Sequence, residues 1–193
     1  NKKRGEKCEA RLLQVLSTSP QETADVCPHF GRCGGCTYQS LDYSAQLELK
    51  EKQVKEILDN AINGEYQFDG IIGSPVNEHY RNKMEFSFCD AYKDGPLTLG
   101  LHKKGSSHDV LTAADCKLVH PDMTEILKCV LAFFGERNVP YYRKMQHVGF
   151  LRHLLLRRGD TTGEILVNLV TTTQEKHDLQ PLVEELLALK LEG

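Results

Sequence analysis

Two pairs of segments alternate apolar with polar residues, and each pair predicts a β-hairpin. Residues 80–88 predict the first strand, the turn signal Asp94-Gly95 follows it, and leucines at 97, 99 and 101 predict the returning strand. Residues 149–158 and 164–172 predict a second hairpin, which the segment 159–163 would close.

Helical periodicity marks three further segments. After a cap at Ser40, apolar residues at helical spacing predict a helix over 41–62, which Asn63-Gly64 would end. A second helix is predicted after Pro121, and a third over 177–189. Helices that alternate with hairpins are typical of an α+β domain, with antiparallel β-hairpins and packed helices.

The N-terminal residues show a different pattern. Residues 10–16 predict one short strand with no partner nearby, which we interpret as the last strand of a small β-barrel. We therefore expect three parts: a barrel remnant over 1–19, a cysteine-rich loop over 20–40, and an α+β domain over 41–193.

Composition and charge narrow the class of protein. The chain has 193 residues, enough for one substantial domain, and its net charge of −3 excludes a uniformly basic nucleic-acid binder. The charge is uneven, because residues 137–158 contain six basic and no acidic side chains. No run of eighteen apolar residues occurs, so we expect no membrane contact and a place in the cytoplasm. We also expect a monomer.

Three cysteines, Cys27, Cys33 and Cys36, lie within ten residues of a glycine-rich segment. In a reducing compartment such a cluster favours metal binding over disulfides. Converging thiolates bind an iron–sulfur cluster or zinc, each of which takes four ligands. The sequence therefore predicts a metal site, with His29 left open as a competing ligand or a packing residue.

The fourth ligand has to come from the cysteines outside this loop, which are Cys8, Cys89, Cys116 and Cys129. Cys129 lies beside an apolar helical stripe, and Cys89 ends an alternating strand, so both are expected in the core. Cys116 precedes a predicted helix in a loop that can reach the other three. We prefer Cys116 for this reason.

Candidate nucleic-acid contacts come from clusters of basic residues, some of them beside aromatic ones. Arg and Lys neutralise phosphates, and aromatic rings stack unpaired bases. The clusters stand in four places: His79-Tyr80-Arg81-Asn82-Lys83, His102-Lys103-Lys104, Arg152-His153 and Arg157-Arg158. On spacing alone they fit solvated outer faces of strands equally well.

Motifs for catalysis are missing from the sequence. It has no glycine-rich nucleotide motif, no nucleophile elbow and no zinc-protease motif. We therefore predict no catalytic residue and no residue that binds an organic cofactor in this chain.

The string Cys27-Pro28-His29-Phe30-Gly31-Arg32-Cys33-Gly34-Gly35-Cys36-Thr37-Tyr38-Gln39 resembles the iron–sulfur RNA uracil-5-methyltransferases. These enzymes use S-adenosylmethionine to make 5-methyluridine in 23S ribosomal RNA, and close relatives act on transfer RNA. Further matches follow in the family's order: Tyr80-Arg81-Asn82-Lys83, Leu99-Gly100-Leu101-His102, Asp115-Cys116 and Gly149-Phe150-Leu151-Arg152-His153.

The resemblance implies specific site residues. It places a [4Fe-4S] cluster on four cysteines, which are Cys27, Cys33, Cys36 and Cys116. Its matches at two strand openings imply RNA contact through Arg81, Lys83, Arg152 and His153. The partner would be a single-stranded loop of ribosomal or transfer RNA, because the target base must be flipped out.

Family members usually begin with a β-barrel TRAM domain and end with a Rossmann-like methyltransferase domain. The second of these carries the S-adenosylmethionine site, a nucleophilic cysteine that attacks uracil C6, and a catalytic glutamate. None of those motifs occurs in this sequence. We interpret the chain as the central, cluster-bearing RNA-recognition part of such an enzyme, acting on 23S ribosomal RNA and inactive by itself.

Two alternatives stay open from the sequence. One is an autonomous RNA-binding protein that a zinc ion or an iron–sulfur cluster stabilises. The other is a redox module, which is the weaker interpretation because the chain has no second cluster motif and no flavin or nucleotide motif.

Overall fold

The computed structural model describes the chain except for residues 1, 5–6, 11, 24–26 and 107. It forms two compact units, one made of residues 1–25 and 40–68, the other of residues 26–39 and 69–193. This division differs from the boundaries expected from the sequence. The helix predicted to open the α+β domain lies in the first unit, and the cysteine-rich loop lies with the sheet in the second.

The first unit contains a small antiparallel sheet, β1 (Lys2–Arg4) with β2 (Lys7–Glu9), and the helix α1 (Tyr43–Ala61). The predicted strand over 10–16 is wrong for the residues that the structure describes, which form no strand there; residue 11 lies outside them. Leu13 and Leu16 are 89% and 88% exposed. A short apolar run forms a stable strand only with a neighbouring strand and a surface to cover, and these side chains have neither.

Helix α1 follows the sequence prediction except at its start. Its cap is Asp42, not Ser40, because the Asp42 carboxylate accepts the backbone N–H of Ala45 at 2.8 Å. The Ser44 hydroxyl donates to the same carboxylate at 2.7 Å. These hydrogen bonds, that of Ala45 first, lower the pKa of Asp42. A charged cap at the positive end of the helix is therefore favoured.

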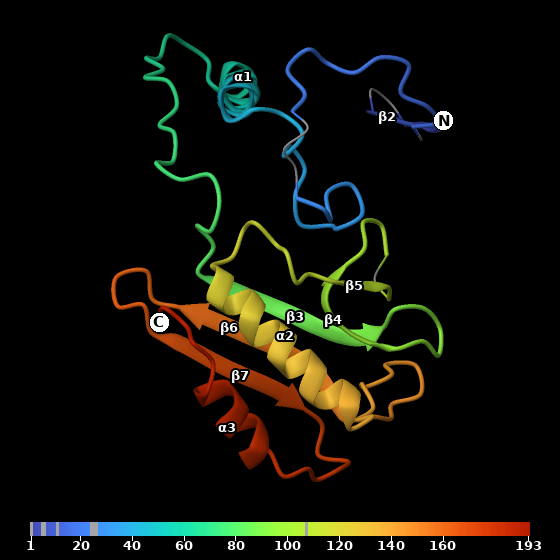
Figure 1. The fold of residues 1–193 in the computed structure, drawn as a ribbon. Helices are drawn as coiled ribbons and strands as arrows, with labels where there is room; N and C mark the ends of the chain where they lie inside the picture. The colour runs from blue at the N-terminus through green and yellow to red at the C-terminus, as the bar shows by residue number, and fades with distance from the viewer. Residues whose placement is uncertain (1, 5–6, 11, 24–26, 107) are drawn as a thin grey trace. The chain divides into compact units, whose positions relative to one another are not determined.

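The second unit is built on one antiparallel sheet with the strand order β5-β4-β3-β6-β7 (Figure 1). The strands are β3 (Lys83–Asp90), β4 (Leu97–His102), β5 (Val110–Thr112), β6 (Leu151–Arg158) and β7 (Ile165–Thr171). Both predicted hairpins are confirmed, and pairing of β3 with β6 joins them. The sequence analysis missed β5, since three residues are too few to show alternation.

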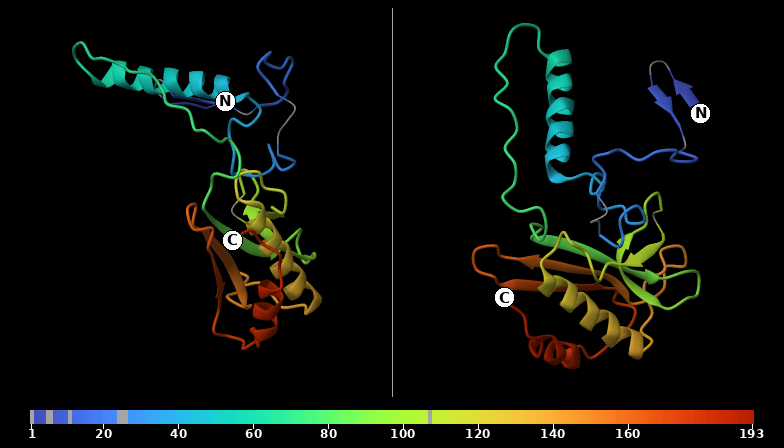
Figure 2. Two further views of the ribbon diagram at one scale, coloured as in Figure 1. Left: turned by 60° about the vertical axis from the view of Figure 1, so that its left-hand side comes forward. Right: turned by 45° about the horizontal axis from the view of Figure 1, so that its top comes forward.

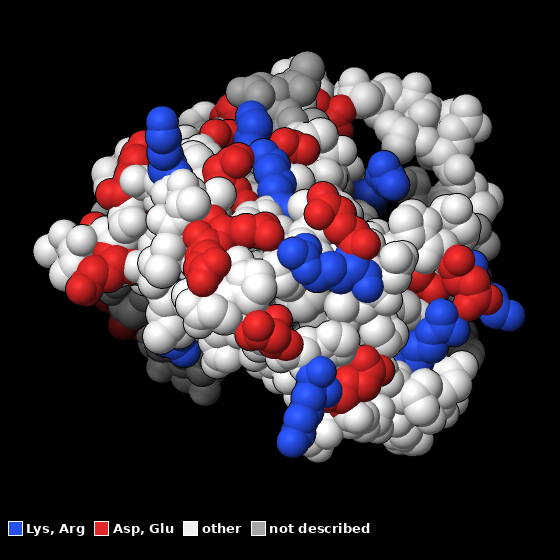
Figure 3. All heavy atoms as spheres, turned by 60° about the horizontal axis from the view of Figure 1, so that its bottom comes forward, with Lys and Arg blue, Asp and Glu red and all other residues white. Residues whose placement is uncertain are grey.

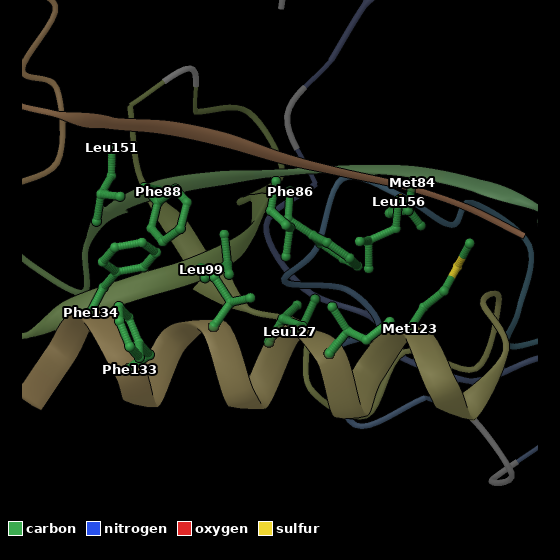
Figure 4. Close-up of a cluster of buried hydrophobic side chains, with 14 of the residues drawn as sticks. Met84, Phe86, Phe88, Leu99, Met123, Leu127, Phe133, Phe134, Leu151 and Leu156 are labelled. Atoms are coloured by element: carbon green, nitrogen blue, oxygen red, sulfur yellow. The ribbon is translucent and has the colours of Figure 1, made fainter. Parts of the chain in front are cut away.

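Helices α2 (Pro121–Glu136) and α3 (Gln180–Leu187) pack on the same face of this sheet (Figure 2). The core between α2 and the strands is shown in Figure 4. Phe86, Leu127 and Phe134 are fully buried there, and the ring of Phe88 meets that of Phe134 edge-on at 6.0 Å. Both helices and the α+β class with antiparallel strands are thus confirmed. None of the described helices has the length and apolar character needed to cross a membrane.

The other face of the sheet points away from both helices, and we call it the open face. Burial alternates along β3, so the buried residues face α2 while the residues between them point outward. The pairing register of β3 with β6 shows which residues of β6 point outward beside them. The open face presents Lys83, Glu85, Ser87, His153, Leu155 and Arg157.

Candidate functional site

The cysteine-rich loop is held by its own backbone and by the turn after β4. The N–H of Cys33 donates to the His29 carbonyl at 2.8 Å, closing a tight turn in which Gly31 has a φ of +79°. The N–H of Gly34 then donates to the carbonyl of His102 at 3.1 Å. The loop therefore has a fixed position against the sheet of the second unit.

This position brings together the four cysteines predicted as ligands. Cys27, Cys33, Cys36 and Cys116 line one small cavity. Cys27 and Cys116 are each only 8% exposed, and the Cys27 thiol approaches the carbonyl oxygen of Asp115 at 3.7 Å. Cys129 does not line this cavity. The segment around residue 116 thus reaches the loop from almost ninety residues away.

Burial controls the chemistry of these thiols. It raises the pKa of Cys36, and the neighbouring Cys116, Cys33 and Cys27 raise it further, while the charge of Arg81 opposes them. Burial also raises the pKa of Cys116, against two backbone hydrogen bonds that lower it. Both side chains are therefore neutral thiols at pH 7 unless a bound cation favours the thiolate form.

Two further features describe the cavity. His29 is one of the residues that line it, and its Nε2 atom is buried without a hydrogen-bond partner among the described residues. The backbone N–H of Gly35 donates to the Cys33 sulfur at 3.3 Å. Within the part of the chain that the structure describes, no three His, Cys, Asp or Glu side chains form a group suited to a single metal ion.

The four predicted RNA contacts fall in three places in the second unit. Arg81 lies beside the cysteine loop, where its charge acts on Cys36 and its guanidinium is 4.0 Å from the Met84 sulfur. Lys83 lies at one end of the open face, opposite Arg157. Arg152 and His153 lie near its other end, about 13 Å away by strand geometry. The structure brings Arg152 and His153 together but keeps them apart from Arg81 and Lys83.

Arg152 and His153 line a second cavity of about 290 Å³, which the sequence analysis did not predict. Residues 141–146 form one wall, and the ends of β3, β4 and β6 form the floor. Four Lys or Arg side chains and two Asp side chains contribute to the lining. The signal was the basic segment 137–158 with Tyr141 and Tyr142 inside it, but only the fold shows that these side chains face the sheet.

The chain is similar in sequence to proteins named RNA methyltransferases. It is 44% identical over 193 residues to an uncharacterized RNA methyltransferase of Clostridium acetobutylicum, and 42% identical over 184 residues to another of Caldanaerobacter subterraneus subsp. tengcongensis. All of the chain is covered in the first comparison and 94% in the second. The chain spans only 42% and 41% of the length of these relatives. No family model matches the chain.

A solved structure is also similar to the chain. The tRNA (uracil-54, C5)-methyltransferase of Pyrococcus abyssi, crystallised with S-adenosyl-L-homocysteine, superposes on 89% of the chain with a TM-score of 0.64. The two sequences are 26% identical, and the chain covers 37% of that protein. The chain is therefore similar, in sequence and in fold, to part of these proteins named RNA methyltransferases.

Proposed function

We propose that this chain is the RNA-recognition part of an S-adenosylmethionine-dependent RNA uridine C5 methyltransferase, acting on 23S ribosomal RNA. The similarity to the Pyrococcus abyssi tRNA (uracil-54, C5)-methyltransferase over most of the chain carries the uridine C5 methylation in this proposal. The ribosomal target rests on the sequence resemblance of residues 27–39. The local chemistry supports a binding role, because the described residues offer a basic cavity on a sheet and no matching nucleophile. In this role the chain holds a single-stranded RNA loop, and a further part of the enzyme transfers the methyl group.

Binding to RNA is tested by titrating a labelled uridine-containing stem-loop at several salt concentrations. The double variant Lys83→Ala/Arg152→Ala removes one charge near each end of the open face. Each lost phosphate contact should make the slope of log affinity against log salt shallower by about one unit. The matched control, Lys128→Ala/Lys190→Ala, removes the same charge from exposed sites elsewhere. Equal slopes for the two double variants would contradict the proposed contacts.

We further propose that Cys27, Cys33, Cys36 and Cys116 hold one [4Fe-4S] cluster. Four cysteine thiols line one cavity, and four cysteine thiolates are the ligand set that a [4Fe-4S] cluster takes. The N–H of Gly35 donates to the Cys33 sulfur at 3.3 Å, a contact of the kind that supports metal-bound thiolates.

The cluster would supply a cross-link between the loop and the segment at residue 116. Closing a loop of this length removes conformational freedom from the unfolded chain, worth on the order of 4 kcal/mol by analogy with disulfides. Cys27, Cys33, Cys36 and Cys116 would hold the cluster; Cys27 and Cys116 are buried, and Cys33 and Cys36 are partly buried.

Iron and sulfide analysis of protein purified without oxygen tests this assignment. Wild type should contain about four iron and four sulfide per chain, as a [4Fe-4S] cluster requires. Cys116→Ser should lose both, whereas the control Cys129→Ser should retain them. Zinc in place of iron, or loss of the cluster from Cys129→Ser alone, would refute the assignment.

A further inference from the structure

The cavity on the open face has the features of a ligand site. Its volume of about 290 Å³ is near the lower end of the range for small-molecule pockets. His102 is one of the residues that line it.

The charge available to a ligand in this cavity is positive. Burial acts to raise the pKa of Asp90, but hydrogen bonds led by those from the Asp94 backbone N–H and the Tyr141 hydroxyl together outweigh it and lower this pKa. Burial first, and then the contact with Asp90, raise the pKa of Tyr141 to about 12. The Asp90 carboxylate is therefore charged, and the Asp94 N–H and the Tyr141 hydroxyl already bind it. Arg152 and Lys144, in contrast, are exposed at the rim, and no carboxylate pairs with either among the described ion pairs.

An aromatic ring stands beside these cations. The guanidinium of Arg152 lies 5.2 Å from the ring centre of Tyr142, which is half-buried. The Tyr142 hydroxyl and the Nδ1 atom of His147 are 3.1 Å apart, within hydrogen-bond distance, which fixes the ring. A fixed ring with an adjacent guanidinium can stack an unpaired base and bind its phosphate.

We propose that this cavity holds one unstacked nucleotide of a single-stranded RNA, with its phosphate against Arg152 and Lys144 and its base against Tyr142. The proposal deepens the RNA-recognition role stated above and rests on it. The bound nucleotide is a neighbour of the methylated uridine, not the uridine itself. Cys89 also lines the cavity; burial raises the pKa of its thiol, which disfavours the nucleophilic thiolate, and its sulfur lies 3.2 Å from the carbonyl oxygen of His108.

The charge of the chain favours a local contact with RNA over a broad electrostatic one. The face of the molecule in Figure 3, which is not the open face, mixes acidic and basic side chains. The net charge of −3 agrees with this picture. Binding of single-stranded RNA must then depend on sites where a few cations and an aromatic ring meet, as they do in this cavity.

The test is a titration of isotope-labelled protein with uridine 3′-monophosphate, followed by NMR. Saturable shifts of His102, His153 and Tyr142 signals are expected, and Arg152→Ala/Lys144→Ala should weaken binding about tenfold or more. Tyr142→Ala should weaken it without changing net charge. Lys128→Ala/Lys190→Ala, whose positions do not line the cavity, should bind like wild type. Equal binding of inorganic phosphate, or no shift at these signals, would overturn the proposal.

The stem-loop titration separates this proposal from the proposed function. If the stem-loop binds but the mononucleotide leaves the cavity signals unchanged, the cavity proposal is wrong and the RNA-recognition role stands. If the mononucleotide binds in the cavity but no RNA stem-loop binds, the RNA-recognition role is wrong, and the cavity is a site for free nucleotides.

Discussion

Gly149 packs closely against the backbone of Tyr141, which lines the open-face cavity, and substituting Gly149 should destabilise the second unit strongly. Its φ is +116°, a conformation that a residue with a side chain rarely adopts. A Cβ atom at this position would lie 2.1 Å from the carbonyl oxygen of Tyr141, which is backbone and cannot rotate away. The position is also pinned, because the Gly149 N–H donates to the Gln174 side chain at 3.1 Å and its carbonyl accepts the Thr172 hydroxyl at 2.7 Å.

These two effects set the magnitude. Strained backbone costs about 1–3 kcal/mol, and overpacking costs about as much again, so Gly149→Ala should lower the free energy of unfolding by about 3 kcal/mol or more. The matched control is Gly135→Ala, on the exposed side of α2, where a Cβ would meet nothing within 4 Å. Alanine is the better helix former, so this variant should gain about 0.5–1 kcal/mol.

Urea denaturation of both variants, followed by circular dichroism, measures the two changes. If Gly149→Ala is as stable as wild type, the positive φ of residue 149 and its close contact with Tyr141 are wrong. The position of Tyr141 in the cavity lining would then be wrong as well. If Gly135→Ala instead destabilises the protein, the exposed end of α2 is wrong.

Three further predictions follow from the same structure. Asp122→Ala should lower the free energy of unfolding by about 3 kcal/mol, because the buried Asp122 carboxylate accepts the N–H of Glu192 at 3.2 Å and pairs with Arg158 at 3.8 Å. The control Glu125→Ala removes one partner of an exposed ion pair and should cost little. Equal losses of stability in urea denaturation would contradict this prediction. NMR titration should give His153 a pKa below its ordinary 6.5, because burial lowers it. The stability that depends on a neutral His153 is then present above about pH 6.5 and is lost as the pH falls through the lowered pKa. A titration midpoint above 6.5 would contradict the burial of His153. Calorimetry should detect no saturable heat with S-adenosylmethionine, since the sequence carries no cofactor motif, and clear binding would contradict that assignment.

The hairpins and helices of the second unit could be predicted from the sequence because each has a strong local signal. Alternation at residues 84–88 and 97–101 specified β3 and β4, and the periodic apolar residues after Pro121 specified α2. The grouping of the cysteines was also within reach, because glycines and short spacing constrain three of them. Cys116 was harder to predict, because no local signal shows which distant loop folds back onto Cys27, Cys33 and Cys36.

The failures have a physical pattern as well. The run 10–16 is apolar enough for a strand, but strand formation depends on a partner that no local signal reveals. The open-face cavity depends on register, because pairing of Ser87 with His153 brings the start of β6 beside the end of β3. The aromatic and basic residues of the segment 141–146 acquire a role only once the chain folds back over the sheet.

The most direct test of the account is cross-linking of the chain to a stem-loop that carries 4-thiouridine at its loop positions, followed by mass spectrometry of the linked peptides. The account predicts cross-links to peptides that contain residues 141–153, with fewer in Arg152→Ala/Lys144→Ala and an unchanged yield in Lys128→Ala/Lys190→Ala. Cross-links confined to peptides outside the open face, or no specific cross-link to the stem-loop, would contradict the claim that this surface recognises RNA.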